Sequence, residues 1–187
     1  VLSLPSGLNF DNYVRTLDKM NYFRSLGNTV LLSGVSVTLI ILFSSVAGWK
    51  LSRSKTRLSR FLFGLFVFSM LIPFSSIMIP IYRVILLLKL KNSLLGLSLV
   101  YAGLGVSMAV FLYHGFVKGI PQELEEAAMI DGCTQFQVFR YMVFPLLKPI
   151  TATVCITNVL WVWNDFLLPL IVLSDNKKYT LLLSTNT

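Results

Sequence analysis

The sequence predicts an all-α membrane protein, because its composition is too apolar for a soluble domain and its apolar residues occur in long runs. Apolar residues make up 55% of the 187 positions and charged residues only 13%. An ordinary soluble domain has about a quarter of its residues charged. A fold of this size leaves much of its surface exposed, so it cannot bury this many apolar side chains. Lipid is the solvent that fits the composition.

Four apolar runs are long enough to cross a membrane as helices, which takes about 20 residues. They cover approximately residues 29–49, 61–82, 94–117 and 150–173. Inside lipid each backbone polar group must be paired within its own segment, so every run is expected to be a helix. None alternates apolar and polar residues as barrel strands do. We therefore expect a single transmembrane domain over residues 1–187.

Basic residues predict the orientation of the spans. The connection after the first run contains five basic residues and no acidic one, namely Lys50, Arg53, Lys55, Arg57 and Arg60. Such loops stay in the cytoplasm, which places residues 1–28 outside and the loop 118–149 inside. Arg83, Lys89 and Lys91 in the outward connection weaken the contrast, but the first loop is denser in charge. The surplus of 16 basic over 8 acidic residues thus indicates a membrane topology and no nucleic acid.

Two prolines fall in the second run. Pro73 and Pro80 are seven residues apart, so they would share one face of a continuous helix. Each removes a backbone donor, and a span tolerates this only where neighbours or water satisfy the freed carbonyl groups. Two interpretations stay open: the helix is kinked for structural reasons, or its bent face lines a passage.

The loop 118–149 is patterned as two short helices with a sharp turn between them. The features of the first helix are a proline for its first position, acidic residues at its positive end and a glycine that can close it: Pro121, Glu123, Glu125, Glu126 and Gly132. A second helix is expected to begin at Thr134, with Gln137 completing a capping box, and to stop near Phe144 before Pro145.

One face of the first helix is small and shallow, with acidic residues beside it. Its members recur at spacings of three and four: Leu124, Ala127, Ala128 and Asp131. Such a face fits a groove on another protein whose rim is basic. The alternative is an amphipathic helix on the lipid surface, but those helices are usually basic on their polar side. The acidic side favours docking on a protein partner.

These residues resemble the EAA signature of permease subunits of bacterial and archaeal binding-protein-dependent ABC importers. The matching residues are Glu126-Ala127-Ala128, Asp131-Gly132 and Phe144-Pro145. Trp163-Asn164-Asp165 and Pro169 are similar to the maltose-type, MalG-like carbohydrate branch. So are Asn9 to Tyr13, Asn28, Ile72-Pro73 and Ile79-Pro80. The resemblance covers nearly the whole chain, and Cys133 departs from the alanine common after the glycine.

The resemblance implies a type I importer (MetI-like) fold, seen here without its first and last spans. It implies a multi-pass subunit of the cytoplasmic (inner) membrane that forms the pore of a sugar importer and is not an enzyme. Its implied partners are ABC ATPase subunits, a second and different permease, and an extracytoplasmic sugar-binding protein. The chain has no phosphate-binding G-x-x-x-x-G-K-[ST] loop, so ATP is expected to bind to the partner. No cofactor is expected.

The resemblance also implies roles for individual residues of the loop. Glu126 would pair with a basic residue of the ATPase, Ala127 and Ala128 would allow close approach, and Gly132 would make the turn, with Asp131 beside it. Asp165 is the only acidic residue within a predicted span, and such residues are candidates for function. Either it caps a helix break or meets interfacial water, or it faces the passage with Trp163 and Asn164 and contacts a sugar.

Other classes of protein fit less well. A membrane enzyme would need clustered acidic, histidine or cysteine residues, whereas His114 is a lone histidine expected at the interface. Cys133 and Cys155 have no metal-ligand spacing, so neither a disulfide nor a metal site is expected. An ion channel lacks support because no span has a filter-like loop or a ring of charge. Importers of amino acids, peptides or polyamines remain the alternative within the family.

Overall fold

The computed structural model describes residue 17 and residues 19–185, and the regular elements within these residues are all helical. In chain order they are α2 (Tyr22–Arg53), α3 (Arg57–Met70), α4 (Phe74–Leu87), α5 (Leu94–Val117), α6 (Gln122–Ile130), α7 (Gln135–Gln137), the π-helix η1 (Val138–Val143), α8 (Phe144–Leu146), α9 (Lys148–Asn164), α10 (Leu167–Val172), the 3₁₀-helix η2 (Asn176–Lys178) and α11 (Leu181–Ser184). The all-α prediction is confirmed for this part of the chain. Asn9 to Tyr13 lie outside it.

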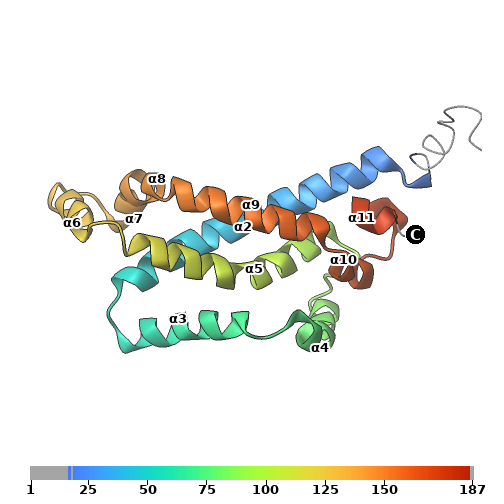
Figure 1. Cartoon of the computed structure of the whole chain (residues 1–187), viewed down its shortest axis with the longest axis horizontal. Helices are drawn as coiled ribbons and strands as arrows, with labels where there is room; N and C mark the ends of the chain where they lie inside the picture. The colour runs from blue at the N-terminus through green and yellow to red at the C-terminus, as the bar shows by residue number, and fades with distance from the viewer. Residues whose placement is uncertain (1–16, 18, 186–187) are drawn as a thin grey trace, which may run out of the picture.

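Three helices, α2, α5 and α9, lie side by side and form the body of the molecule (Figure 1). The helices α2 and α5 approach closely at Gly48, where an added Cβ would lie 2.6 Å from the Cβ of Tyr113. Small residues allow helix backbones to approach in this way. Several buried hydroxyl groups on α2 bond back to the helix, as when the Ser36 hydroxyl donates to the carbonyl of Leu32 at 2.6 Å, whereas the buried Ser33 and Ser52 hydroxyl oxygens have no hydrogen-bond partner among the described residues.

The interior is divided into two apolar clusters, one toward each end of the bundle. The cluster nearer α6 includes Trp49, Tyr113 and Phe139. The cluster nearer α10 includes Tyr101 and Leu168. In Figure 1, α6 to α8 lie at one end of the bundle, and α10 and α11 lie at the other. We call these the α6 end and the α10 end.

The predicted helix over 94–117 is confirmed as α5, whose start is capped by the Ser93 hydroxyl accepting from the Gly96 amide at 3.1 Å. The first predicted span is part of the longer α2. Residues 22–28 therefore belong to this helix and not to a separate preceding segment. Asn28 anchors this extension at the α10 end, because its amide donates to the carbonyl groups of Lys177 at 3.0 Å and Tyr179 at 2.9 Å.

The predicted continuous helix over 61–82 differs from the structure. The chain turns by 108° between α3 and α4, and the break falls at residues 71–73. Pro73 explains the break, because it lacks the N–H that a continuing helix would need, and it stands instead at the N-cap of α4. Of these two prolines, only Pro80 lies within a helix. The two prolines thus do not share a helix face.

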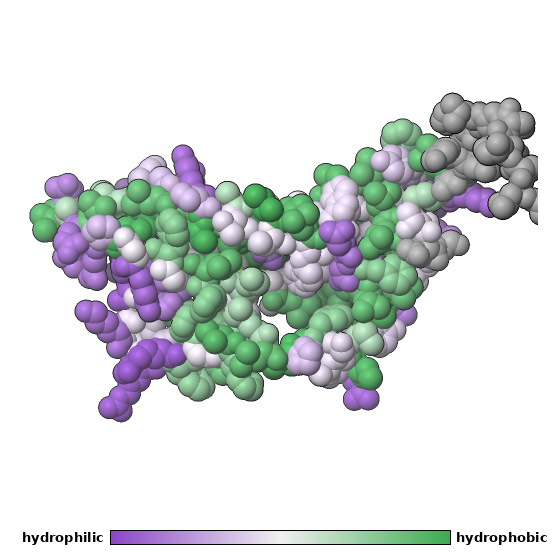
Figure 2. Space-filling view, in the orientation of Figure 1, coloured by the Kyte–Doolittle hydropathy of each residue, from purple (hydrophilic) through white to green (hydrophobic). Residues whose placement is uncertain are grey.

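The surface matches a membrane environment. By length and composition α2 and α5 could each cross a membrane, and two bent pairs, α3 with α4 and the segment 135–146 with α9, could supply two further spans. Apolar side chains cover the middle of the face seen in Figure 2, while hydrophilic residues gather toward the α6 end. Phe43 of α2 and Phe61 of α3, each 63% exposed, are typical of the outward apolar positions.

Candidate functional site

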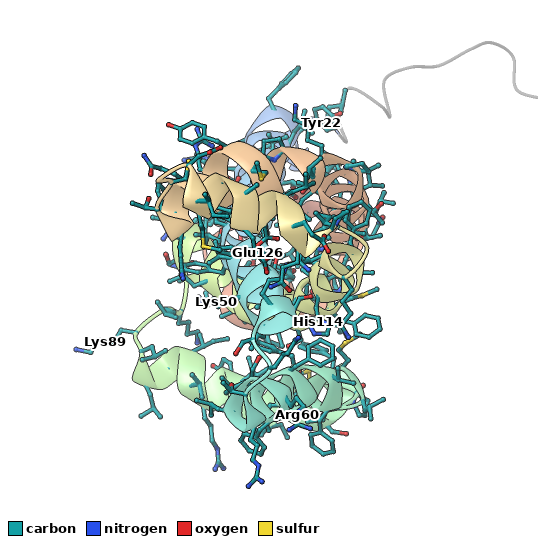
Figure 3. The ribbon with its side chains drawn as sticks, turned by 90° about the vertical axis from the view of Figure 1, so that its left-hand side faces the viewer. Tyr22, Lys50, Arg60, Lys89, His114 and Glu126 are labelled. Atoms are coloured by element: carbon teal, nitrogen blue, oxygen red, sulfur yellow. The ribbon has the colours of Figure 1, made fainter. Side chains whose placement is uncertain are left out.

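The helix α6 carries the acidic part of the candidate signature. It follows Pro121, which occupies the N-cap and not the first helical position that was predicted. Glu123 and Glu125 lie in its first turn, where the amide groups of the helix end favour negative charge. Figure 3 views the molecule from this end and shows Glu126 on α6, with Lys50 of α2 and Arg60 of α3 at the same end.

Gly132 closes α6 as predicted. Its φ of 89° lies in the left-handed region that glycine occupies without a steric penalty. The Gly132 amide donates to the carbonyl of Met129 at 3.1 Å, and the Cys133 amide donates to that of Ala128 at 3.0 Å. These two bonds form a Schellman motif. The sharp turn after α6 is therefore fixed by backbone hydrogen bonds that require a positive φ at one residue.

The second half of the loop begins at the predicted capping box. The Gln137 amide donates to the Thr134 hydroxyl at 3.4 Å, and the Gln137 side chain accepts from the Thr134 amide at 2.7 Å. The predicted stop before Pro145 is wrong, because the chain continues as a π-helix into α8 and ends at Leu146. Pro145 lies in the first turn of α8, where its missing N–H is tolerated. A bend of 73° then separates segment 135–146 from α9.

The residues of the signature do not all face the same way. Glu126, Ala127, Asp131 and Gly132 are exposed, and the Glu126 carboxylate accepts a 2.8 Å bond from the side chain of Gln122. Ala128 is only 6% exposed and packs inside the chain. The predicted outer face therefore keeps its acidic residues and Ala127, whereas Ala128 allows α6 to lie close to its own bundle.

The sequence does not single out Glu125 from the other acidic residues of α6, yet its side chain joins α6 to α2. It is 5% exposed and points into the bundle, where Trp49 Nε1 donates to its Oε2 at 2.8 Å. Arg53 Nε and Nη2 lie 2.8 and 2.7 Å from its Oε1. The sequence contains one indication of this burial, because Glu125 and Ala128 are three residues apart and so share a helix face. The sequence alone did not show on which side of α6 the bundle lies.

At the opposite end, the candidate substrate residues adjoin a helix break. The predicted span 150–173 is interrupted, because α9 ends at Asn164 and Asp165 has an extended backbone. Asp165 Oδ1 accepts from the Leu167 amide at 3.0 Å, and Oδ2 accepts from the Tyr101 hydroxyl at 2.8 Å. Both carboxylate oxygens therefore have structural partners within the chain.

The two residues before Asp165 differ in their exposure. Trp163 is half-buried, whereas Asn164 is exposed and donates to the carbonyl of Leu160 at 2.7 Å. His114 is 8% exposed, so its side chain packs within the chain. Its ring stacks on Phe63 with 3.7 Å between ring centroids, which joins α5 to α3. Asn164 is thus the most accessible polar group of the predicted substrate path.

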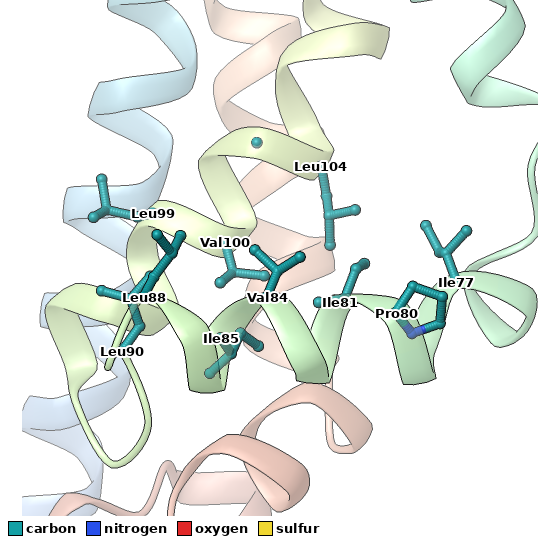
Figure 4. Close-up of a pocket in the computed structure, with 11 residues that line it drawn as sticks. Ile77, Pro80, Ile81, Val84, Ile85, Leu88, Leu90, Leu99, Val100 and Leu104 are labelled. Carbon is teal, nitrogen blue, oxygen red and sulfur yellow. The ribbon is translucent and has the colours of Figure 1, made fainter.

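An apolar groove of about 540 Å³ separates α4 from α5 (Figure 4). Its walls are aliphatic and include Pro80, Ile81, Val84, Leu99 and Leu104. Pro73 is not among the residues that line it. The groove has the polarity of a lipid chain or of a helix face, and it lacks the hydrogen-bonding groups that a hydrophilic solute requires.

Comparison with known proteins matches residues 40–187 to the family described as binding-protein-dependent transport system inner membrane component. The chain is 39% identical to the probable starch degradation products transport system permease protein AmyC of Thermoanaerobacterium thermosulfurigenes, over 96% of this chain and 65% of that protein. It is 36% identical to the melibiose/raffinose/stachyose import permease protein MelC of Bacillus subtilis, over 95% of this chain and 64% of that protein.

A third relative is the multiple sugar-binding transport system permease protein MsmG of Streptococcus mutans, 37% identical over 96% of this chain and 65% of that protein. The chain thus spans just under two thirds of the length of these relatives. Among solved structures, a bacterial ABC transporter that imports the acidic polysaccharide alginate has a similar fold. Its TM-score is 0.83 at 24% identity, over 96% of this chain and 62% of that one.

Proposed function

The chain belongs to the family of binding-protein-dependent transport system inner membrane components, and on this premise we propose that it is the pore-forming subunit of an ATP-driven sugar importer. The observation that carries the proposal is the exposed acidic face of α6, closed by the Gly132 turn. The chain has no phosphate-binding loop of the G-x-x-x-x-G-K-[ST] type, and it carries an acidic helix at one end of its bundle. Both features suit a subunit that is driven by another protein.

The proposed partners supply what the chain lacks. A pair of ABC ATPase subunits would close on ATP and move α6, while an extracytoplasmic sugar-binding protein would deliver the solute. A second, different permease would complete the pore across from this chain. We propose that the α6 end faces the cytoplasm, consistent with the five basic residues over the end of α2, the connection and the start of α3. The spans would then alternate between inward-open and outward-open arrangements.

On α6, we propose that the outward residues form the contact with the ATPase. Glu126 and Asp131 would meet basic residues, Ala127 would allow close approach, and Gly132 would hold the turn. Ala128 would act indirectly, because its small side chain lets α6 lie against its own bundle. Charged groups at such a rim mainly set specificity and the rate of association.

For the solute, we propose a mono- or oligosaccharide. AmyC, MelC and MsmG, which are 36 to 39% identical to this chain, carry sugar-transport names. Within the candidate path, Trp163 offers a ring and Asn164 an exposed amide, which are groups that can pack on and hydrogen-bond a sugar. Asp165 contributes less to this proposal because both of its oxygens have partners within the chain.

The test is reconstitution of the full-length chain with the gene products encoded beside it. The proposal expects an ABC ATPase to co-purify, and the proteoliposomes to take up labelled maltotriose or raffinose only with ATP inside and a binding protein outside. Labelled glutamine and spermidine serve as matched solutes. Uptake of either of these two instead of a sugar would assign the chain to the other solute class. Absence of any co-purifying ATPase contradicts the importer assignment.

A further inference from the structure

The last turn of α2 holds both halves of the loop 118–149 through side chains. Trp49 and Arg53, one helical turn apart, bind the Glu125 carboxylate of α6 through three contacts of 2.7 to 2.8 Å. Arg53 Nη2 also donates to the carbonyl of Ile120 at 2.8 Å, just before α6 begins. Each oxygen of Glu125 therefore has a partner from α2.

Two further contacts join the same turn of α2 to the second half of the loop. Lys50 Nζ donates to Gln135 Oε1 at 2.9 Å, and the Trp49 ring packs on Phe139 with 5.2 Å between centroids. By contrast, the backbone leaves the bundle through the turn after α5 and returns through the 73° bend at Leu147. The side-chain contacts to α2 thus connect α6 directly to a long helix.

The contacts between Glu125 and Arg53 are shielded from water. The Arg53 and Glu125 side chains are 17% and 7% exposed, so water does not compete strongly for their hydrogen bonds. A charge-assisted pair with fixed geometry resists sliding more than an exposed ion pair does. Glu126, the next residue, points outward and has no such bond to α2. The two glutamates therefore divide the helix into an inner, attached side and an outer, exposed side.

We propose that Glu125, Arg53 and Trp49 form a clamp through which α6 and the adjoining end of α2 move as one rigid body. A displacement of α6 then passes directly into α2, which packs along α5 and α9. The three clamp residues are positioning residues, because they act by holding α6 in place. The bonds of the clamp all lie within this chain. The inference rests on the proposed function only for the source of the displacement, which is the ATPase.

A pair of spin labels on α6 and α2 tests the clamp in the complete importer. Cys133 is exposed directly after α6 and serves as one labelling site, in a chain that also carries Cys155→Ala. The second label is placed by Phe43→Cys, at an outward position about 15 Å before Arg53 along α2. Distances are measured without nucleotide and with ATP and vanadate. The clamp predicts one narrow distribution that is the same in both states.

The decisive variant is Arg53→Met combined with Glu125→Gln. It removes both charges, so neither is left buried without a partner, and the new amide oxygen can still accept from Trp49. We expect loss of the narrow distribution and a shift when ATP and vanadate are added. Glu126→Gln is the matched control and should leave the distribution as in the parent. A narrow, unshifted distribution in the double variant, or a shift in the parent, overturns the clamp.

These outcomes are separate from those of the proposed function. Trapped nucleotide is quantified in the same samples, so absence of trapping or of an ATPase subunit counts against the importer assignment. The width of the distribution without nucleotide still decides whether Glu125 and Arg53 hold α6 on α2. A lower yield of the double variant with unchanged width in the recovered protein would reduce the contact to a folding role and overturn the proposal.

Discussion

The hydroxyl of Tyr101 on α5 donates a 2.8 Å hydrogen bond to the carboxylate of Asp165, at the point where α9 ends and α10 begins. Tyr101 is fully buried, and the second oxygen of Asp165 caps the amide of Leu167. This carboxylate therefore links α5 to the break between α9 and α10. An acidic residue within a predicted span has a structural use here that needs no solute.

From this geometry, Asp165→Ala is expected to lower stability by about 1–3 kcal/mol, because it leaves the buried Tyr101 hydroxyl without its partner. Tyr101→Phe should cost less, since it removes the donor as well. The measurement is thermal unfolding of the purified full-length chain in detergent. A double-mutant cycle should give a coupling of about 0.5–3 kcal/mol. Unchanged stability together with a changed KM for the solute would favour the substrate-path role instead.

Gly48 provides a test of the contact between α2 and α5. A Cβ at this position would lie 2.6 Å from Tyr113 Cβ and 3.0 Å from the His114 amide nitrogen, so Gly48→Ala forces the helices apart. The expected cost is about 1–3 kcal/mol, as for other overpacked sites. Gly34→Ala, also on α2, is the matched control because nothing lies within 4 Å of its Cβ position. Equal unfolding temperatures of the two variants would contradict the close contact.

Gly132 provides a test of the turn after α6. Its φ is 89° and the space around it is open, so backbone strain alone opposes a side chain there. Gly132→Ala should destabilise the turn by roughly 1–2 kcal/mol. Gly132→Asp is expected to abolish ATP-dependent uptake and the coupling of ATPase activity to transport in the reconstituted importer.

Two variants separate strain at Gly132 from a general effect of mutating the loop. Gly132→Asn should keep more uptake than Gly132→Ala, because asparagine tolerates a positive φ better than alanine does. Gly119→Ala is the matched glycine of the same loop, with ordinary contacts and no positive φ, and should transport normally. Full uptake by Gly132→Asp would contradict both the turn and its role in coupling.

Local chemistry made part of this fold predictable from the sequence. The helix over 94–117, the Thr134 to Gln137 capping box and the Gly132 turn each depend on residues that are close together in the chain. Pro73 was recognised as a disturbance, but a proline does not specify whether a helix kinks or turns by 108°. That choice depends on the packing of α4 against its neighbours.

The roles of single side chains depended on contacts that are distant in the sequence. Glu125 and Glu126 are neighbouring residues of the same type, and the contacts of Trp49 and Arg53 on α2 with Glu125 distinguish them. Likewise, the function of Asp165 is defined by Tyr101, which is 64 residues away. Periodicity shows which residues share a face, but the bundle decides which face is buried.

These two glutamates yield the last prediction, because neighbouring residues of the same type should fail in different ways. Glu125→Ala leaves Arg53 poorly exposed and without its carboxylate, which for a buried pair costs about 3–5 kcal/mol. Glu126→Ala removes an exposed carboxylate whose bond in this chain is to Gln122, so the free energy of unfolding should stay within about 0.5 kcal/mol of the parent.

Binding of the ATPase should show the reverse order. If Glu126 meets a basic residue of the partner, Glu126→Ala weakens association about tenfold and reduces its dependence on salt, because a charged contact at the rim has been lost. Glu125→Gln, which keeps the acceptor for Trp49, should bind the ATPase within about twofold of the parent once the folded fractions are matched. The measurement is equilibrium binding of the purified ATPase subunit to proteoliposomes at low and high salt. Equal loss of binding in both variants would mean that the inner and outer sides of α6 are not separate in function.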